Sequence, residues 1–245
     1  MSFIPGCDNG ADALNSLATI YGVAEDAIQE ILQHPDVLEI ASISDQMSSE
    51  WFPAVIIQLL RSSPNYDLTH AAYYHTTSYD GSLEWFDEGL HGSLEGAQRF
   101  LEKISHLVPE ELRDAVHQTT AALIARRSEC EGTRGALAGP YAWNTMTAAS
   151  AAEHGGKYQV PEVIRDLWSQ SGIGNGGLID LSERIRQHLK PVVVKFKGRT
   201  SDLDRYCSTL WAYLLTQDEP VHLTHTFQAN GERIPRGDIL ALIDL

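Results

Sequence analysis

Apolar residues recur at three- and four-residue spacing along the first third of the chain, a pattern that is typical of amphipathic helices. One such stripe covers 14–21 and continues through 24–32, with Asp8 or Asn9 before it as the capping residue. Pro35 is expected to close this helical segment, because proline cannot continue a helix that precedes it.

A second helix is expected over 46–61, where apolar residues again face one side, and the turn-forming residues 62–65 end it. No linker rich in Pro, Gly or Ser follows. Residues 1–65 are therefore expected to form a helical N-terminal cap, and residues 66–245 the main domain.

The pattern changes to that of a strand over 68–75, where Tyr and Thr are frequent. Further strands are expected near the C-terminus, over 191–196, 221–227 and 239–243. Helices are expected between the strands, over 81–88, 93–105, 109–127, the Ala-rich stretch ending at 153, 162–169 and the segment containing 206–214. Helices grouped around strands that gather at the end of the chain predict an α+β fold.

Composition narrows the class of function. The chain has 245 residues, is 43% apolar and carries a formal net charge of -15, which argues against a general nucleic-acid binder. Cys7, Cys130 and Cys207 are far apart and include no CxxC pair, so neither a zinc site nor a disulfide framework is expected. This use of cysteine is typical of a protein in a reducing compartment. No signal peptide and no membrane-spanning run is visible, so we expect a soluble, cytoplasmic protein. Delivery into a host or competitor cell by a secretion machine would leave no readable signal.

The stretch that carries candidate chemistry is 71–77, an aromatic run that ends in His75, Thr76 and Thr77. Residues two apart on a strand point to the same face, so an imidazole and a hydroxyl are presented side by side. Two unrelated groups of enzymes use such a pair.

The first group is suggested by several short motifs in a matching order. They are the strand 71–77, the segment 81–90, the middle blocks 139–142 and 158–164, and the closing stretch 234–243 with its Ile-Pro-x-x-Asp-Ile-Leu pattern. Together they resemble the ADP-ribosyltransferase superfamily over residues from about 69 to 245. The N-terminal helices are not part of the resemblance.

The resemblance implies an NAD-binding cleft between two small sheets and transfer of ADP-ribose from NAD to a macromolecule. Toxins, effectors and defence proteins are the usual setting of such transferases. His75 would hold a ribose of NAD within a motif that includes Thr76 and Thr77. Tyr158 would stack on the nicotinamide, with Tyr141 as its rival.

The resemblance also implies a glutamate beside the reacting sugar. Breaking the N-glycosidic bond leaves positive charge on the ribose, so a fixed carboxylate stabilises the transition state more than the ground state. Glu219 stands in the corresponding region, but Pro220 after it departs from the family pattern, and Glu232 is the alternative. The acidic composition favours a protein acceptor over nucleic acid. No metal ligands are expected.

Two alternatives stay open. A second His-x-Thr triplet, His222 to Thr224, would allow a two-histidine phosphoesterase, in which paired imidazoles act as base and acid on a phosphodiester. A non-catalytic interaction module on a decayed transferase scaffold would keep the motifs without the chemistry.

The glycine-rich stretch 172–177 resembles a phosphate-binding loop, but it follows an expected helix instead of a strand. A helix C-cap and loop is the favoured interpretation, and a lid over the NAD cleft is the alternative. With four glycines in six residues, it is expected to be mobile without ligand.

Overall fold

The structure of the protein is a computed structural model. It describes residues 3–43, 47, 49, 51–131, 139–154, 160–166, 179–216 and 227–245. The fold is mixed helix and sheet, which confirms the α+β class. No helix within the described ranges is both long and apolar enough to cross a membrane.

The chain divides into two compact units, each built from several chain segments. Unit 1 comprises Met1–Tyr74, Ala142–Ala151 and Lys195–Phe227, and unit 2 comprises His75–Tyr141, Ala152–Val194 and Gln228–Leu245. The expected N-terminal cap falls wholly within unit 1. The expected boundary between residues 65 and 66 stays a prediction.

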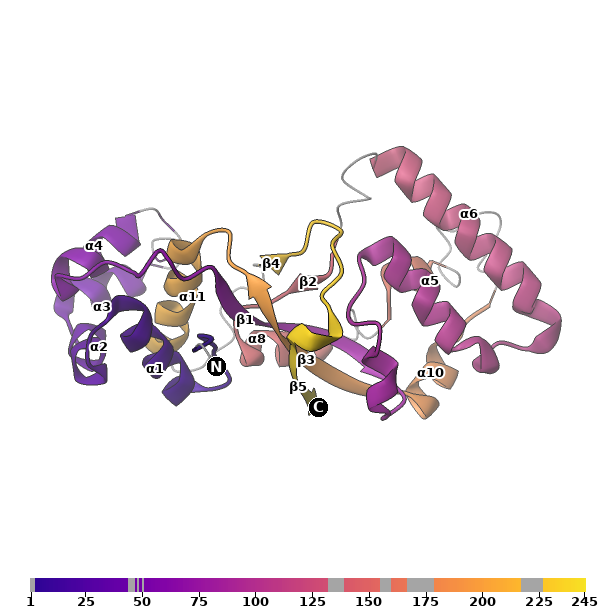
Figure 1. Cartoon of the computed structure of the whole chain (residues 1–245), viewed down its shortest axis with the longest axis horizontal. Helices are drawn as coiled ribbons and strands as arrows, with labels where there is room; N and C mark the ends of the chain where they lie inside the picture. The colour runs from indigo at the N-terminus through magenta and orange to yellow at the C-terminus, as the bar shows by residue number, and fades with distance from the viewer. Residues whose placement is uncertain are drawn as a thin grey trace. The chain divides into compact units, whose positions relative to one another are not determined.

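Unit 1 is a group of helices around α11 (Leu203–Leu215). The N-terminal helices of this unit are α1 (Gly10–Tyr21), α2 (Glu25–Leu32), α3 (Pro35–Ala41) and α4 (Trp51–Leu60), drawn in indigo to purple in Figure 1. Helix α1 packs against α11 and α2, and α4 also contacts α11. The predicted cap is confirmed, since the side chain of Asn9 accepts a hydrogen bond from the Asp12 amide at 3.0 Å.

The helical segment before Pro35 does end, at Leu32, and Pro35 is in addition the first residue of α3, which the sequence did not predict. Proline fits this position because the first amide of a helix has no intrahelical acceptor and the ring already holds a helical φ. His34 caps the helix, with its Nδ1 accepting from the Asp36 amide. The preceding helical stripe is also interrupted at Gly22, whose left-handed φ of 64° ends α1.

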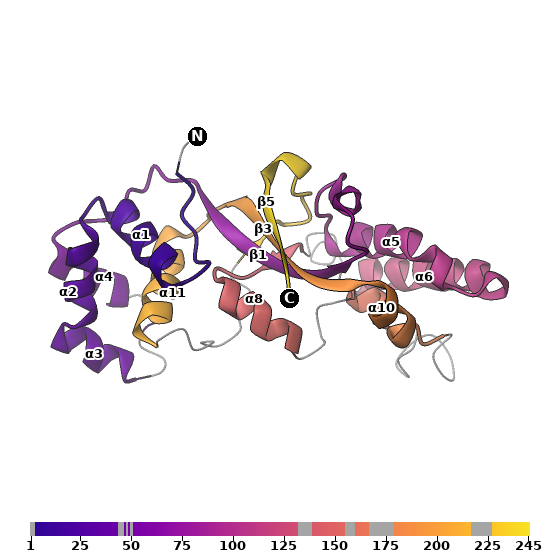
Figure 2. The same ribbon diagram turned by 90° about the horizontal axis from the view of Figure 1, so that it is seen from below.

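Two sheets hold the strands. The three-stranded antiparallel sheet has the order β1 (His70–Tyr79), β3 (Lys190–Arg199) and β5 (Ile239–Asp244), seen from below in Figure 2. The second sheet pairs β2 (Tyr141–Ala142) with β4 (Phe227–Gln228). The strands expected near 68–75, 191–196 and 239–243 are confirmed, and residues 221–226 of the remaining one lie outside the described residues. The boundary between the units falls within β1 and within β3.

The aromatic core of unit 1 lies on these strands. Tyr73 packs on Phe227 and Phe196, with ring centroids 4.4 and 6.1 Å apart. A Cβ added at Gly198 would lie 2.6 Å from the Phe227 ring and 2.8 Å from the Tyr73 ring. This position therefore needs glycine, because only a residue without a side chain lets the rings approach the strand so closely.

Unit 2 gathers most of the remaining helices. They are α5 (Ser93–Lys103), α6 (Arg113–Glu131), α9 (Glu162–Arg165) and α10 (Ser182–His188), with 3-10 turns at Leu83–Phe86, Ser105–Leu107 and Glu110–Leu112. Helix α8 (Met146–His154) follows β2, and its residues up to Ala151 belong to unit 1. The core of unit 2 is aliphatic, with Leu101, Ile104 and Ile164 among its least exposed residues. The helix expected over 81–88 is only a single 3-10 turn.

Candidate functional site

Strand β1 presents the predicted histidine and threonine on one side. His75 and Thr77 are half-buried, whereas Thr76 between them is 1% exposed and Ser78 is buried. This alternation is that of a strand with one face turned to the core. His75 and Thr77 therefore share a face, and Thr76 belongs to the opposite one.

The His75 ring is held by the backbone of β2. Its Nδ1 lies 2.7 Å from the carbonyl oxygen of Tyr141, which is 66 positions away in the chain. A carbonyl oxygen only accepts hydrogen bonds, so Nδ1 donates and carries a proton. In a neutral imidazole, Nε2 is then the accepting nitrogen, which suits it to receive a hydroxyl proton.

Tyr141 is in turn fixed through the pairing of β2 with β4. Near Tyr141, the Pro140 carbonyl accepts from the Ala229 amide at 3.3 Å, and that of Gly139 accepts from Gly231 at 3.1 Å. Tyr141 is half-buried. The backbone carbonyl of Tyr141 orients His75. The sequence had indicated only the ring of Tyr141, as a possible stacking surface.

The motif segments 81–90 and 234–243, which are far apart in the chain, meet in unit 2. Leu90 and Ile234 form an antiparallel bridge with N–H···O distances of 3.0 and 2.8 Å. Gly89 has a φ of 80°, and a Cβ there would lie 2.0 Å from the Ile234 carbonyl oxygen. The Tyr79 hydroxyl at the end of β1 donates to Asp244 at 2.6 Å. The segment 81–90 is thus joined to the closing segment at Ile234, and the end of β1 is bonded to Asp244, directly after that segment.

The alternative carboxylate, Glu232, lies in the turn that follows β4. Its amide donates to the Ala229 carbonyl at 3.0 Å, and its side chain is exposed. Asn230 and Gly231 have φ values of 54° and 80°, so the chain reverses tightly there.

The other candidates lie outside the described residues. They are Tyr158, Glu219, the glycine-rich stretch 172–177 and the second triplet at 222–224. The expected approach of His75 to Tyr158 across a cleft therefore stays a prediction. Within the described ranges no group of three His, Cys, Asp or Glu side chains could hold a metal ion.

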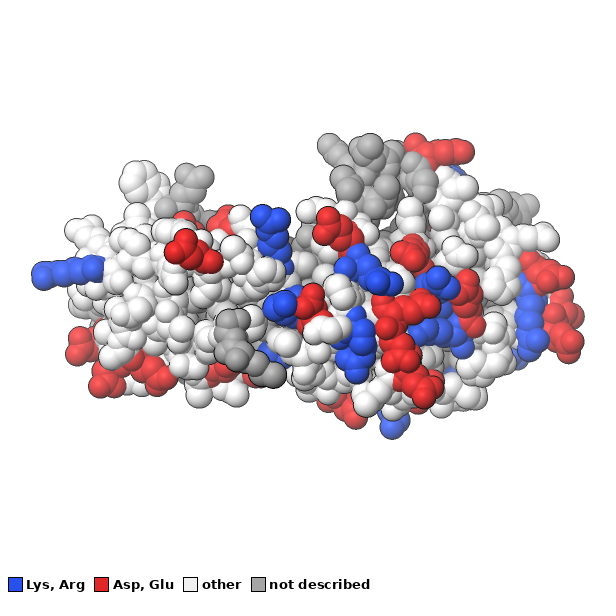
Figure 3. All heavy atoms as spheres, viewed as in Figure 1, with Lys and Arg blue, Asp and Glu red and all other residues white. Residues whose placement is uncertain are grey.

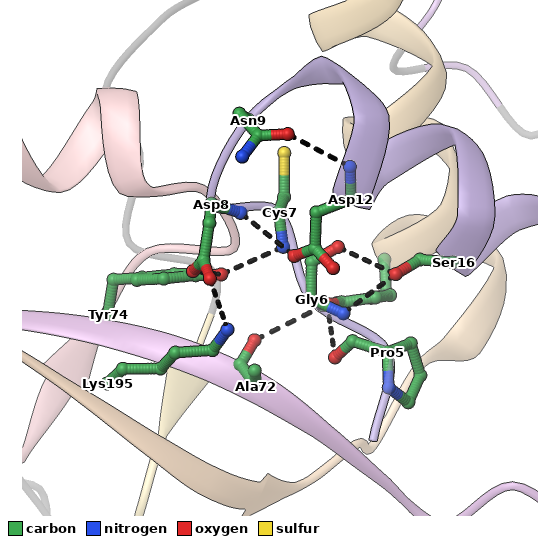
Figure 4. A network of polar contacts seen from close by, with 11 residues as sticks. Pro5, Gly6, Cys7, Asp8, Asn9, Asp12, Ser16, Ala72, Tyr74 and Lys195 are labelled. Atoms are coloured by element: carbon green, nitrogen blue, oxygen red, sulfur yellow. Dashed lines mark hydrogen bonds and ion pairs between the residues drawn. The ribbon is translucent and has the colours of Figure 1, made fainter. Parts of the chain in front are cut away.

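Unit 1 contains a polar network that the sequence did not indicate (Figure 4). The Tyr74 hydroxyl donates to Asp8 Oδ1 at 2.7 Å and accepts from the Cys7 amide at 2.8 Å. Lys195 donates to Asp8 Oδ2 at 2.7 Å, and its Nζ lies 5.7 Å from the centre of the Tyr74 ring. A buried tyrosine signals that a polar partner is needed, but nothing local identifies an aspartate 66 positions away.

This network is suited to holding the fold together and not to chemistry. Burial raises the pKa of Tyr74, and the hydrogen bond to Asp8 raises it further, so the phenol stays neutral. Both carboxylate oxygens of Asp8 have donors. The network thereby ties the segment before α1 to β1 and β3.

Two cysteines are equally unsuited to nucleophilic chemistry. Cys7 and Cys207 are buried free thiols. Burial raises the pKa of Cys207, which keeps it protonated.

No family model, curated protein or solved structure matches the chain.

Proposed function

We propose that this chain is an NAD-dependent ADP-ribosyltransferase, a pentosyltransferase that modifies a macromolecule. What supports the proposal is that two motif segments of the resemblance, 81–90 and 234–243, are joined in unit 2 by the bridge between Leu90 and Ile234. Strand β1, which carries the first motif, is bonded through Tyr79 to Asp244, directly after the closing motif. The segments 81–90 and 234–243 are far apart in the sequence, so their pairing is a property of the fold. Motifs that matched by chance would give no reason to expect it. The proposal includes the split-sheet fold of that superfamily.

His75 is the residue on which NAD binding depends. Its Nδ1–H is committed to the Tyr141 carbonyl, so the ring is oriented before ligand arrives. A pre-oriented group loses little conformational entropy on binding. The accepting Nε2 would receive a hydrogen bond from a ribose hydroxyl, and the Thr77 hydroxyl on the same face would add a second contact.

The chemistry needs a carboxylate and an aromatic surface. Glu219, or Glu232 in its place, would stabilise the positive charge that develops on the ribose as nicotinamide leaves. Tyr158, or Tyr141, would stack on the nicotinamide ring. NAD is thus a substrate here and leaves as nicotinamide and a transferred ADP-ribose.

The net charge and the cysteines support a proposal for the acceptor and the compartment. The net charge of -15 favours a protein acceptor over nucleic acid. A reducing compartment such as the cytoplasm suits the buried free thiols of Cys7 and Cys207. A role as a toxin, effector or defence protein fits this activity.

The test measures NAD binding by calorimetry and nicotinamide release with a cell lysate as the source of acceptors. Wild-type protein should bind NAD and release nicotinamide. His75→Ala should weaken NAD binding by about 1–3 kcal/mol, because a ribose hydroxyl loses its acceptor in a desolvated site.

The matched control is His106→Ala. His106 also places Nδ1 against a backbone carbonyl, that of Lys103 at 3.1 Å, but it is exposed and lies outside β1. Its replacement should leave NAD affinity unchanged. Absence of NAD binding by the wild type would refute the proposal. NAD binding without nicotinamide release would identify a non-catalytic module, and cleavage of a cyclic phosphodiester would identify the phosphoesterase.

A further inference from the structure

Helix α4 is almost wholly apolar yet only partly covered. Of its ten residues, from Trp51 to Leu60, only Gln58 is polar, and only Phe52 and Ile56 are buried. A helix that is apolar on all sides is normally enclosed on all sides. Trp51 is 79% exposed, and Ala54 on the next turn is also exposed.

The neighbouring helix α3 continues this apolar surface. It contacts α4, and Leu38 on α3 and Ile43 just after it are both 46% exposed. We call the exposed side chains of Leu38, Ile43, Trp51 and Ala54 the α3–α4 surface. Large exposed apolar side chains that gather on adjacent elements mark interaction sites, and an exposed tryptophan is a frequent anchor.

Acidic side chains predominate around this surface, and Arg61, which is exposed directly after α4, is a nearby positive charge. The first 60 residues contain no Lys or Arg, and nine acidic residues: Asp8, Asp12, Glu25, Asp26, Glu30, Asp36, Glu39, Asp45 and Glu50. Five of them are exposed on α2 and α3, namely Glu25, Asp26, Glu30, Asp36 and Glu39. Figure 3 shows red side chains over α2 and no blue ones there. Helix α2 contacts both α3 and α4, and on α3 itself the exposed Glu39 directly follows the exposed Leu38 in the chain.

We propose that the α3–α4 surface docks a basic amphipathic helix of a partner protein. The apolar face of such a helix would cover Trp51, Leu38 and Ile43, and its Lys and Arg residues would face the acidic side chains of α2 and α3. This site is separate from the strand residues assigned to NAD.

Charge decides between this occupant and two others. An anionic lipid surface would be repelled by the exposed acidic side chains of α2 and α3. A second copy would bring two equally acidic surfaces together, which costs free energy through like-charge repulsion. A basic partner is the occupant that gains from both the apolar and the charged part of the surface.

The experiment uses the full chain and three synthetic peptides of about 18 residues, long enough to form a helix when bound. The first has Leu at helical spacing on one face and Lys elsewhere. The second replaces Lys with Glu, and the third scrambles the Leu/Lys sequence so that no apolar face exists. Binding is measured by fluorescence anisotropy of labelled peptides at low and moderate salt.

The amphipathic Leu/Lys peptide should bind at least about tenfold more tightly than either of the other two. Trp51→Ala should weaken its binding by about tenfold or more, as expected for a central aromatic anchor. The double variant Glu30→Lys and Glu39→Lys should weaken it similarly and reduce its dependence on salt. All three substitutions are at exposed positions, and circular dichroism would verify that each variant folds.

The matched control is Leu83→Ala, at an apolar side chain of unit 2 that is 62% exposed. It should leave peptide binding unchanged. Equal losses in Trp51→Ala and Leu83→Ala, or equal binding of the Leu/Glu peptide, would overturn the proposal. Binding to phosphatidylserine vesicles in place of the peptides would assign the surface to membrane, and a dimer abolished by Trp51→Ala would assign it to self-association.

Discussion

Tyr74 and His75 are neighbours on β1, yet each is held in a different way. Tyr74 belongs to unit 1, and its hydroxyl is anchored by the Asp8 carboxylate, which Lys195 also binds, and by the Cys7 amide. His75 belongs to unit 2 and is anchored by a backbone carbonyl, that of Tyr141.

The difference distinguishes a polar side chain that stabilises the fold, Tyr74, from one that is a candidate for ligand binding, His75. A fully buried phenol with a donor and an acceptor in place has no capacity left for a ligand. A half-buried imidazole fixed through Nδ1 is oriented by the backbone of β2 and is not enclosed as the phenol is. The comparison also predicts which substitutions destabilise each unit. Unit 1 should lose stability when a side chain of the Tyr74 network is removed. Unit 2 should lose stability when the backbone at the bridge between Leu90 and Ile234 is disturbed.

The largest effect is expected from Gly89→Ala. The added Cβ would meet the Ile234 carbonyl oxygen at 2.0 Å, and the φ of 80° is strained for alanine. The free energy of unfolding should fall by about 3 kcal/mol or more, measured by denaturant titration. Gly22→Ala is the matched control, because its φ is 64° but no atom lies within 4 Å of the new Cβ. A loss of about 1 kcal/mol is expected for Gly22→Ala. Equal losses in the two variants would contradict the close approach of Gly89 to the Ile234 carbonyl.

The next largest effect concerns turnover. If Glu219 stabilises the sugar cation, Glu219→Gln should reduce nicotinamide release about a hundredfold, or about 2.7 kcal/mol, with NAD affinity nearly unchanged. Glu232→Gln is the comparison, since Glu232 is the alternative carboxylate. If Glu219→Gln leaves turnover unchanged and Glu232→Gln reduces it, the residue that stabilises the sugar cation is Glu232, in the exposed turn after β4.

Tyr74→Phe tests the side-chain anchor directly. It removes the hydrogen bonds to Asp8 and from the Cys7 amide, so the free energy of unfolding should fall by about 1–3 kcal/mol. NAD affinity should change less than about twofold. His75→Ala should do the reverse, with weaker NAD binding and little loss of stability. A variant of either residue that altered both properties would show that the two sites are coupled.

The smallest effect is the response to alkaline pH. Burial raises the pKa of Tyr74 in the folded state, so its stabilising contribution is complete below pH about 10 and is lost as the pH rises further. Above that pH the unfolding free energy of the wild type should fall more steeply than that of Tyr74→Phe, by up to about 1.4 kcal/mol per pH unit. Denaturant titrations between pH 9 and about 11.5 measure this difference. Parallel curves would mean that Tyr74 ionises as readily in the folded protein as in the unfolded chain.

Several elements were predictable because their signals are local. The cap at Asn9, the helix α11 and the β-branched strand β3 follow from side-chain periodicity and from the preferences of single residues. The start of α3 at Pro35 was missed, because a proline that stops one helix can also occupy the first turn of the next, and only the path of the chain decides whether a new helix follows. The segment 81–88 forms just one 3-10 turn, since its Leu83 stays exposed and gains little from helical packing.

The sequence by itself determined most of the long helices and strands, the acidic charge, and the shared face of His75 and Thr77. Tertiary structure alone decided what those residues touch. The carbonyl that orients His75 is 66 positions away, and the lysine bound to Asp8 is 187 positions away. The physical reason is that periodicity reports which face of an element is buried, whereas the partner on that face depends on long-range closure of the chain.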